Sequence, residues 1–63
     1  MDLKFVGGGR DGHRWSDCRD DIDVVSALSL DHSTTLFYEG EQWGPGWERY
    51  AIDHEHGIAR PIR

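Results

Sequence analysis

The residues with the clearest capacity for chemistry are two histidines, His54 and His56, two positions apart. On a strand this spacing puts both imidazoles on one face. A zinc site needs three or four converging ligands, and spacing alone does not bring further donors to the pair. Exposed histidines are also common beside a glycine turn. We predict no native metal site, although the pair can take up metal adventitiously; the further donors considered are His13, His32, Asp53 and Glu55.

A glycine-rich stretch, Gly7 to Gly12, has the spacing G-x-G-x-x-G after an apolar segment. In dinucleotide-binding folds this pattern cradles a pyrophosphate at the start of a helix. No amphipathic helix follows here, and 63 residues cannot hold the two βαβ halves of such a fold. We therefore predict a tight glycine turn and no cofactor.

A nucleophile is available in Cys18 or a serine, with His13 or His32 as the base. Nothing in their spacing favours a catalytic arrangement, and a chain this short leaves little room for a pocket that excludes water. We predict no catalytic residues and no enzymatic activity. Cys18 is the single cysteine, so it forms no intramolecular disulfide, and we expect it to be a small, partly buried residue.

The elements that position these residues centre on the stretch from Thr34 to Asp53, where two apolar runs flank a Gly-Pro-Gly turn. Five of the seven aromatic residues lie between Phe37 and Tyr50. We predict partner strands over 34–38 and 47–53, with Tyr50 and Ile52 facing the core. Trp47 is expected to fold over a core of Leu36 and Tyr50, and Trp43 to stay exposed or in an interface.

The other segments predict further short strands. Residues 3–6 and 13–15 form a hairpin around the glycine loop, 24–30 form a strand, 31–33 a turn and 58–62 a last strand. Because Pro61 lacks an N–H, that strand is expected at a sheet edge. The fold class is all-β, a small antiparallel meander or half-barrel of about five strands in a single domain, 1–63. The alternative is α+β, with a short helix around residues 17–29.

Length and charge bound the partners. A 63-residue chain buries a small core and gains stability by self-association. The net charge is −5, and residues 24–59 hold six acids and one base, which disfavours direct nucleic-acid binding. No segment has the pattern of a signal peptide or a membrane span. These features predict a cytoplasmic, oligomeric protein without a membrane partner.

The segment from Phe5 to Trp15 resembles the opening of short orphan proteins of actinobacterial phages, which typically read Phe/Leu-x-Gly-Gly-Pro-x-Asp-Gly. Trp47-Glu48-Arg49-Tyr50 resembles their later Tyr-Arg-Tyr-like strand. Gly9 stands here where that family usually has proline, which indicates that the glycines shape the backbone. The resemblance implies an infected host's cytoplasm as the setting and carries no assigned activity.

Two indoles around a stiff turn are typical of interface anchors. We therefore predict a small phage accessory protein that binds a protein of the host and also self-associates. Its apolar contacts come from Trp43, Trp47, Tyr38 and Trp15, and Glu39, Glu41 and Glu48 steer a basic partner. One alternative is a self-assembling virion or scaffold component. Another is an acidic mimic that blocks a nucleic-acid-binding protein.

Overall fold

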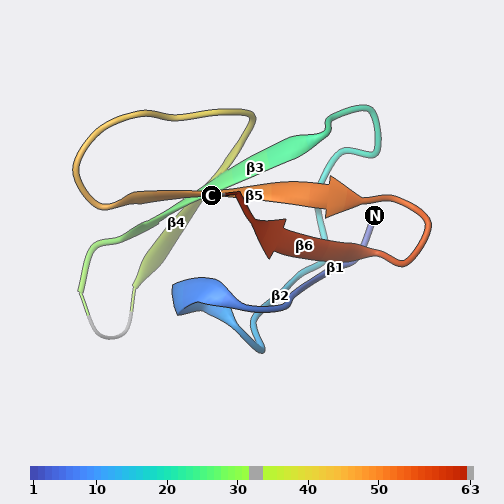
Figure 1. Ribbon diagram of the computed structural model, residues 1–63, viewed down its shortest axis with the longest axis horizontal. Helices are drawn as coiled ribbons and strands as arrows, with labels where there is room; N and C mark the ends of the chain where they lie inside the picture. The colour runs from blue at the N-terminus through green and yellow to red at the C-terminus, as the bar shows by residue number, and fades with distance from the viewer. Residues whose placement is uncertain (32–33, 63) are drawn as a thin grey trace.

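The computed structural model describes residues 1–31 and 34–62, and its strands form one curled, open sheet (Figure 1). The all-β half-barrel prediction is confirmed. The predicted turn at 31–33 falls partly outside the described residues. The sheet order is β2-β1-β6-β5-β3-β4, and the elements are β1 (Leu3–Phe5), a 3-10 turn η1 (Gly8–Arg10), β2 (Arg14–Trp15), β3 (Val24–Ser29), β4 (Thr35–Glu39), β5 (Trp47–Asp53) and β6 (Ile58–Pro61).

The strand predicted over residues 24–30 is confirmed as β3. β3 pairs antiparallel with β4 on one side and with β5 on the other. Its middle residues, Val25, Ser26 and Ala27, are all buried, because sheet neighbours flank β3 and other parts of the chain cover both of its faces. The alternative helix around 17–29 is therefore wrong.

The sheet is mixed rather than wholly antiparallel, because β1 runs parallel to β6. Val6 N–H donates to Ala59 O (2.9 Å), and Lys4 N–H donates to Gly57 O (2.9 Å). The antiparallel hairpin of β1 and β2 thus docks onto the last strand of the chain. The order of the strands in the sheet therefore differs from their order in the sequence. The structure is not a simple meander, because β1 pairs with β6 from the other end of the chain.

The prediction that Pro61 marks an edge strand is wrong, since β6 lies between β1 and β5. Proline fits there because of where its missing N–H would point. Ile62 N–H donates to Arg49 O of β5 (2.9 Å), so the backbone N of Pro61 faces the other way. That side faces β1, whose pairing with β6 stops at the bond from Val6 N–H to Ala59 O, so the proline lies where the parallel ladder ends.

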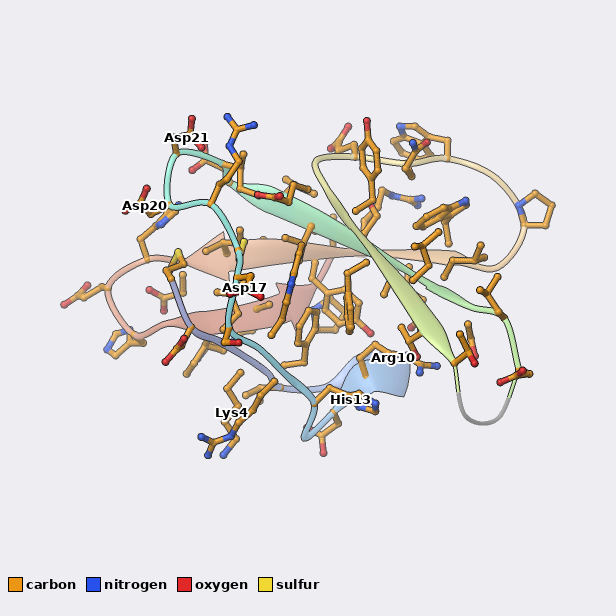
Figure 2. All side chains as sticks on the ribbon, turned by 180° about the vertical axis from the view of Figure 1, so that it is seen from behind. Lys4, Arg10, His13, Asp17, Asp20 and Asp21 are labelled. Carbon is orange, nitrogen blue, oxygen red and sulfur yellow. The ribbon has the colours of Figure 1, made fainter. Side chains whose placement is uncertain are left out.

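The core lies on the inner face of the curled sheet and is built around three rings. Phe5 packs edge-on to Tyr50 (centroids 4.9 Å apart) and lies 5.3 Å from Phe37. Ile52 packs against the same cluster, so the prediction that Tyr50 and Ile52 face the core is confirmed. The segment after β2 covers this face with buried Cys18, and Figure 2 shows it, with Asp17, Asp20 and Asp21 labelled.

Candidate partner-binding surface

A row of apolar side chains crosses the outer face of three adjacent strands. Leu28 of β3 is in register with Leu36 of β4 and with Trp47 of β5. Because side chains alternate faces along a strand, residues in register point to the same side. Trp47 lies three residues from buried Tyr50 on β5 and so points to the opposite face. All three side chains therefore point away from the core.

The next row on this face carries Tyr38, whose ring lies edge-on to Trp47 with centroids 6.5 Å apart. Between them in sheet order lies β3, where the small residue Ser26 leaves room for the 40–46 loop. The Ser26 hydroxyl donates to Gly40 O (2.8 Å) and accepts from Gln42 N–H (2.9 Å). Those two bonds hold the start of the loop that carries Trp43 against the outer face.

Trp43 is fixed by a cation. The Arg49 guanidinium carbon lies 3.7 Å from the centroid of the Trp43 ring, and Arg49 Nη1 donates to Gln42 O (3.1 Å). Cation–π contacts of this kind stabilise by about 0.5–1 kcal/mol at exposed sites. One face of the indole is therefore held by Arg49, while the residue is 69% exposed.

These side chains form one surface, which we call the aromatic face. Trp43, Leu36 (49%) and Tyr38 (46%) are the exposed members, and the others are half-buried. Leu28 and Leu36 were not predicted to belong to this surface. Leu36 lies two residues before Tyr38 and therefore on the same face of the strand, and this spacing could have indicated its membership. The aromatic face consists of Leu28, Leu36, Tyr38, Trp43 and Trp47.

The aromatic anchors predicted from sequence separate into two groups. Tyr38, Trp43 and Trp47 come together, and Trp43 is exposed as predicted. Trp15 lies on the inner side, where its ring stacks on Phe37 with centroids 5.2 Å apart. The expectation that Trp47 covers a core of Leu36 and Tyr50 is wrong, because Trp47 and Leu36 both lie on the face opposite Tyr50.

The acidic residues predicted to steer a partner are dispersed. Glu39 accepts Arg19 N–H (2.8 Å), and Glu48 accepts Gly9 N–H (3.2 Å). Both carboxylates lie on the inner side, bonded to their own chain. Glu41, in contrast, is exposed in the loop two residues before Trp43.

The glycine stretch forms a tight turn, as predicted, and its polar contacts are internal. Arg10 N–H donates to the Tyr50 hydroxyl (3.1 Å), and Arg10 Nη1 donates to Thr35 Oγ1 (2.9 Å). Burial, with the nearby Glu48 carboxylate, raises the pKa of Tyr50, so this hydroxyl stays protonated. The turn thus binds the side chains of β4 and β5.

The histidine pair binds two different carboxylates. His54 Nε2 lies 3.1 Å from Asp23 Oδ1, and His56 Nδ1 lies 2.8 Å from Asp53 Oδ2. Within residues 1–31 and 34–62, no group of three or more potential ligands is arranged to hold a metal ion. His32 lies outside the described residues.

Cys18 and His13 do not form a nucleophile pair. The Cys18 thiol donates to Arg19 O (3.3 Å), and burial, together with Glu39, raises its pKa. A thiol held protonated is a poor nucleophile. His13 is exposed on the turn before β2.

Acid is expected to weaken the turn between β5 and β6. The His56 ring, with its backbone N–H and Arg60, lowers the pKa of Asp53. A lowered pKa in the folded state contributes stability above the ordinary aspartate value of about 4, and this is lost as pH falls below it. We expect Asp53→Asn to lower the urea midpoint at pH 6 and to approach wild type at pH 2.5. Asp17→Asn, at an exposed position, is the control; an Asp53→Asn deficit unchanged in acid contradicts the pairing.

A hollow of about 330 Å³ lies near the other end of the sheet order, beside β1 and β2. It is separate from the aromatic face. Its lining mixes basic, acidic and apolar groups: Asp2, Leu3, Lys4, Arg14, Trp15, Ser16, His56 and Gly57.

Comparisons with protein-family models, curated protein sequences and solved structures find no match to this chain. Across the described part of the chain, no helix has the length and apolar character needed to cross a membrane.

Proposed function

We propose that this protein is a small accessory protein that works by binding another protein through its aromatic face. The observation that carries the proposal is the position of Trp43, Tyr38 and Leu36, large side chains exposed together on the side of the sheet opposite the core. Contiguous exposed apolar groups on a small protein are typical of interaction sites. In a chain with so small a core, apolar side chains that stay exposed are expected to contact another protein.

The anchors are suited to tight binding because they are held before the partner arrives. Arg49 holds Trp43, and the Tyr38 ring packs edge-on against Trp47. Side chains already fixed in place lose less conformational entropy on binding. Trp and Tyr are also the residues most often found to dominate interface energetics. We therefore expect Trp43 to insert into an apolar pocket of the partner.

The expected partner is basic around that pocket. The net charge of −5 gives the protein a field that attracts a cationic surface and speeds its encounter. Glu39 and Glu48 contribute to this field, although they do not lie on the aromatic face. The resemblance to short phage proteins makes a host protein the expected partner.

Trp43→Ala is expected to weaken partner binding about 30-fold, the effect of losing roughly 2 kcal/mol of anchor energy. The partner is first identified by photo-crosslinking from a benzoylphenylalanine at position 43 in cell extract. It is then purified, and its affinity is measured by calorimetry. Because Trp43 is 69% exposed on a surface loop, we expect the circular dichroism spectrum of the variant to match that of wild type.

His13→Ala is the matched control, because His13 is an exposed ring on the turn before β2. It should bind as wild type does. If wild type and Trp43→Ala bound the partner with equal affinity, Trp43 would not be an anchor, and the proposal that the aromatic face is the binding site would be wrong.

A second candidate function is a structural, self-assembling component. The free edge of β4 favours it, since β4 ends the sheet order and an open edge is a template for another chain. Light scattering of the pure protein distinguishes the two: a self-assembling component forms a defined high-order species alone, and an accessory binder remains small.

A further inference from the structure

The β4 strand is an edge whose outward backbone groups can be identified. Leu30 N–H donates to Thr34 O (3.1 Å), which fixes the residues of this segment that bond to β3. Backbone groups alternate sides along an antiparallel strand. The free edge is therefore lined by the N–H and C=O groups of Thr35, Phe37 and Glu39.

Apart from the inward-pointing charge of Glu39, this edge lacks the usual protection against pairing. Proteins blunt their edges with very short strands, prolines, lysines or bulges. The opposite edge, β2, is only two residues long and carries Arg14. In contrast, β4 has five residues, Thr-Leu-Phe-Tyr-Glu, without a proline or a lysine. Within the described residues, no hydrogen bond covers its outward backbone groups.

We propose that a second copy of this chain pairs with β4 to form a two-fold symmetric dimer. The two β4 strands run antiparallel about an axis at Phe37, so that the two half-barrels share one continuous sheet. An isologous pairing of this kind closes on itself and leaves no β4 edge for further growth.

The register follows from the backbone. With the axis at Phe37, Thr35 of each copy lies opposite Glu39 of the other, and all three outward residues are paired. This gives about six interchain hydrogen bonds, whereas an axis at position 36 or 38 gives about four. No like charges face each other, because Glu39 meets a threonine.

The side chains agree with this register on both faces. On the outer face Leu36 of one copy meets Tyr38 of the other, which joins the two aromatic faces across the strand pair. On the inner face Glu39 of the second copy approaches the guanidinium of Arg10, which already donates to Thr35 Oγ1. Arg10 Nε is buried without a hydrogen-bond partner among the described residues and lies 4.0 Å from Glu48 Oε1, so Glu39 of the second copy would add a second carboxylate beside a guanidinium whose hydrogen bonds are incomplete.

The dimer goes beyond the proposed partner binding and does not depend on it. It uses the backbone of β4, whereas the partner site is anchored by the loop residue Trp43. The dimer carries two Trp43 anchors, so a partner with two equivalent pockets would bind with avidity. Because the dimer is tested on pure protein, its failure is distinguishable from failure of partner capture.

Cross-linking tests the register directly. Leu36→Cys and Tyr38→Cys proteins are mixed in equal amounts and oxidised in dilute solution. In the proposed register these positions are a non-hydrogen-bonded pair with Cβ atoms about 5 Å apart, within disulfide range. The mixed disulfide, which joins position 36 of one chain to position 38 of the other, should therefore exceed its statistical share and both symmetric products. Peptide mapping by mass spectrometry excludes products of the buried Cys18, and His13→Cys reports random collision.

A second measurement uses the wild-type chain and a synthetic chain N-methylated at Phe37, whose N–H faces the free edge. Wild type should sediment at twice the 7.2 kDa chain mass. Losing two interchain hydrogen bonds should raise the dissociation constant roughly tenfold or more, with an unchanged circular dichroism spectrum. A wild-type monomer at about 100 μM, a concentration at which interfaces of this class associate, overturns the dimer. Preferential formation of either symmetric disulfide, between two copies of position 36 or two copies of position 38, overturns the register.

Discussion

Phe5→Ala is expected to lower the free energy of unfolding by about 3–5 kcal/mol, which leaves the chain largely unfolded at 25 °C. Phe5 is fully buried and contacts both Tyr50 and Phe37. Alanine leaves a cavity where three rings meet, and few other apolar side chains can collapse into it. A domain this small has only about 5 kcal/mol or less of stability to lose.

Urea unfolding followed by tryptophan fluorescence and far-UV circular dichroism measures this effect. Ile62→Ala is the matched control, because that side chain is 44% exposed; it should lose less than about 1 kcal/mol. If the two variants unfolded at the same urea concentration, the core would not be centred on Phe5.

Gly8→Ala is expected to destabilise the protein by about 2–3 kcal/mol, as backbone strain and a clash add together. Gly8 has φ +68°, and a Cβ there would lie 2.9 Å from the Tyr50 hydroxyl. That hydroxyl cannot withdraw without losing its bond from Arg10 N–H. The turn must then shift away from β5.

Gly12→Ala separates the two contributions. Gly12 has φ +86°, and a Cβ added there would have no other atom within 4 Å, so only backbone strain of about 1 kcal/mol or slightly more applies. Adding Tyr50→Phe to Gly8→Ala removes the clashing oxygen, and a double-mutant cycle should show the coupling. Equal losses for Gly8→Ala and Gly12→Ala would mean that the turn does not rest on Tyr50.

The dimer and the aromatic face place different demands on the same strand. Leu36 and Tyr38 contribute side chains to the outer face, and Phe37 contributes its ring to the core and its backbone to the edge. A change at Phe37 would confuse folding with association. Backbone methylation and the loop variant Trp43→Ala avoid this, since neither alters a core side chain.

Local pattern located the strands well. The run from Trp47 to Asp53 is a strand over the predicted bounds, because an aromatic and β-branched stretch after a Gly-Pro-Gly turn has few competing conformations. Parity then placed Tyr50 and Ile52 on the core side. The glycine turn was also predictable, since glycine readily adopts the positive φ seen at Gly7, Gly8 and Gly12.

For β4, parity could not say which face of the strand would be covered. Leu36 and Phe37 are adjacent and both apolar, and only the pairing of β4 with β3 decides that Phe37 meets the inner rings. The prediction for Trp47 gave the size of its indole more weight than its parity, which puts it on the face opposite Tyr50. The aromatic face depends on the registers Leu28 with Leu36 and Leu28 with Trp47, which join three separate segments.

The sequence by itself determined an all-β chain, its turns and most strand bounds, since these follow from short-range backbone preferences. Only the tertiary structure decided that β1 runs parallel to β6, that Pro61 lies inside the sheet and that β4 is left as an open edge. Those outcomes are set by contacts between residues up to about fifty positions apart, which compete globally for a single small core. Short-range sequence patterns do not specify which of these long-range pairings forms.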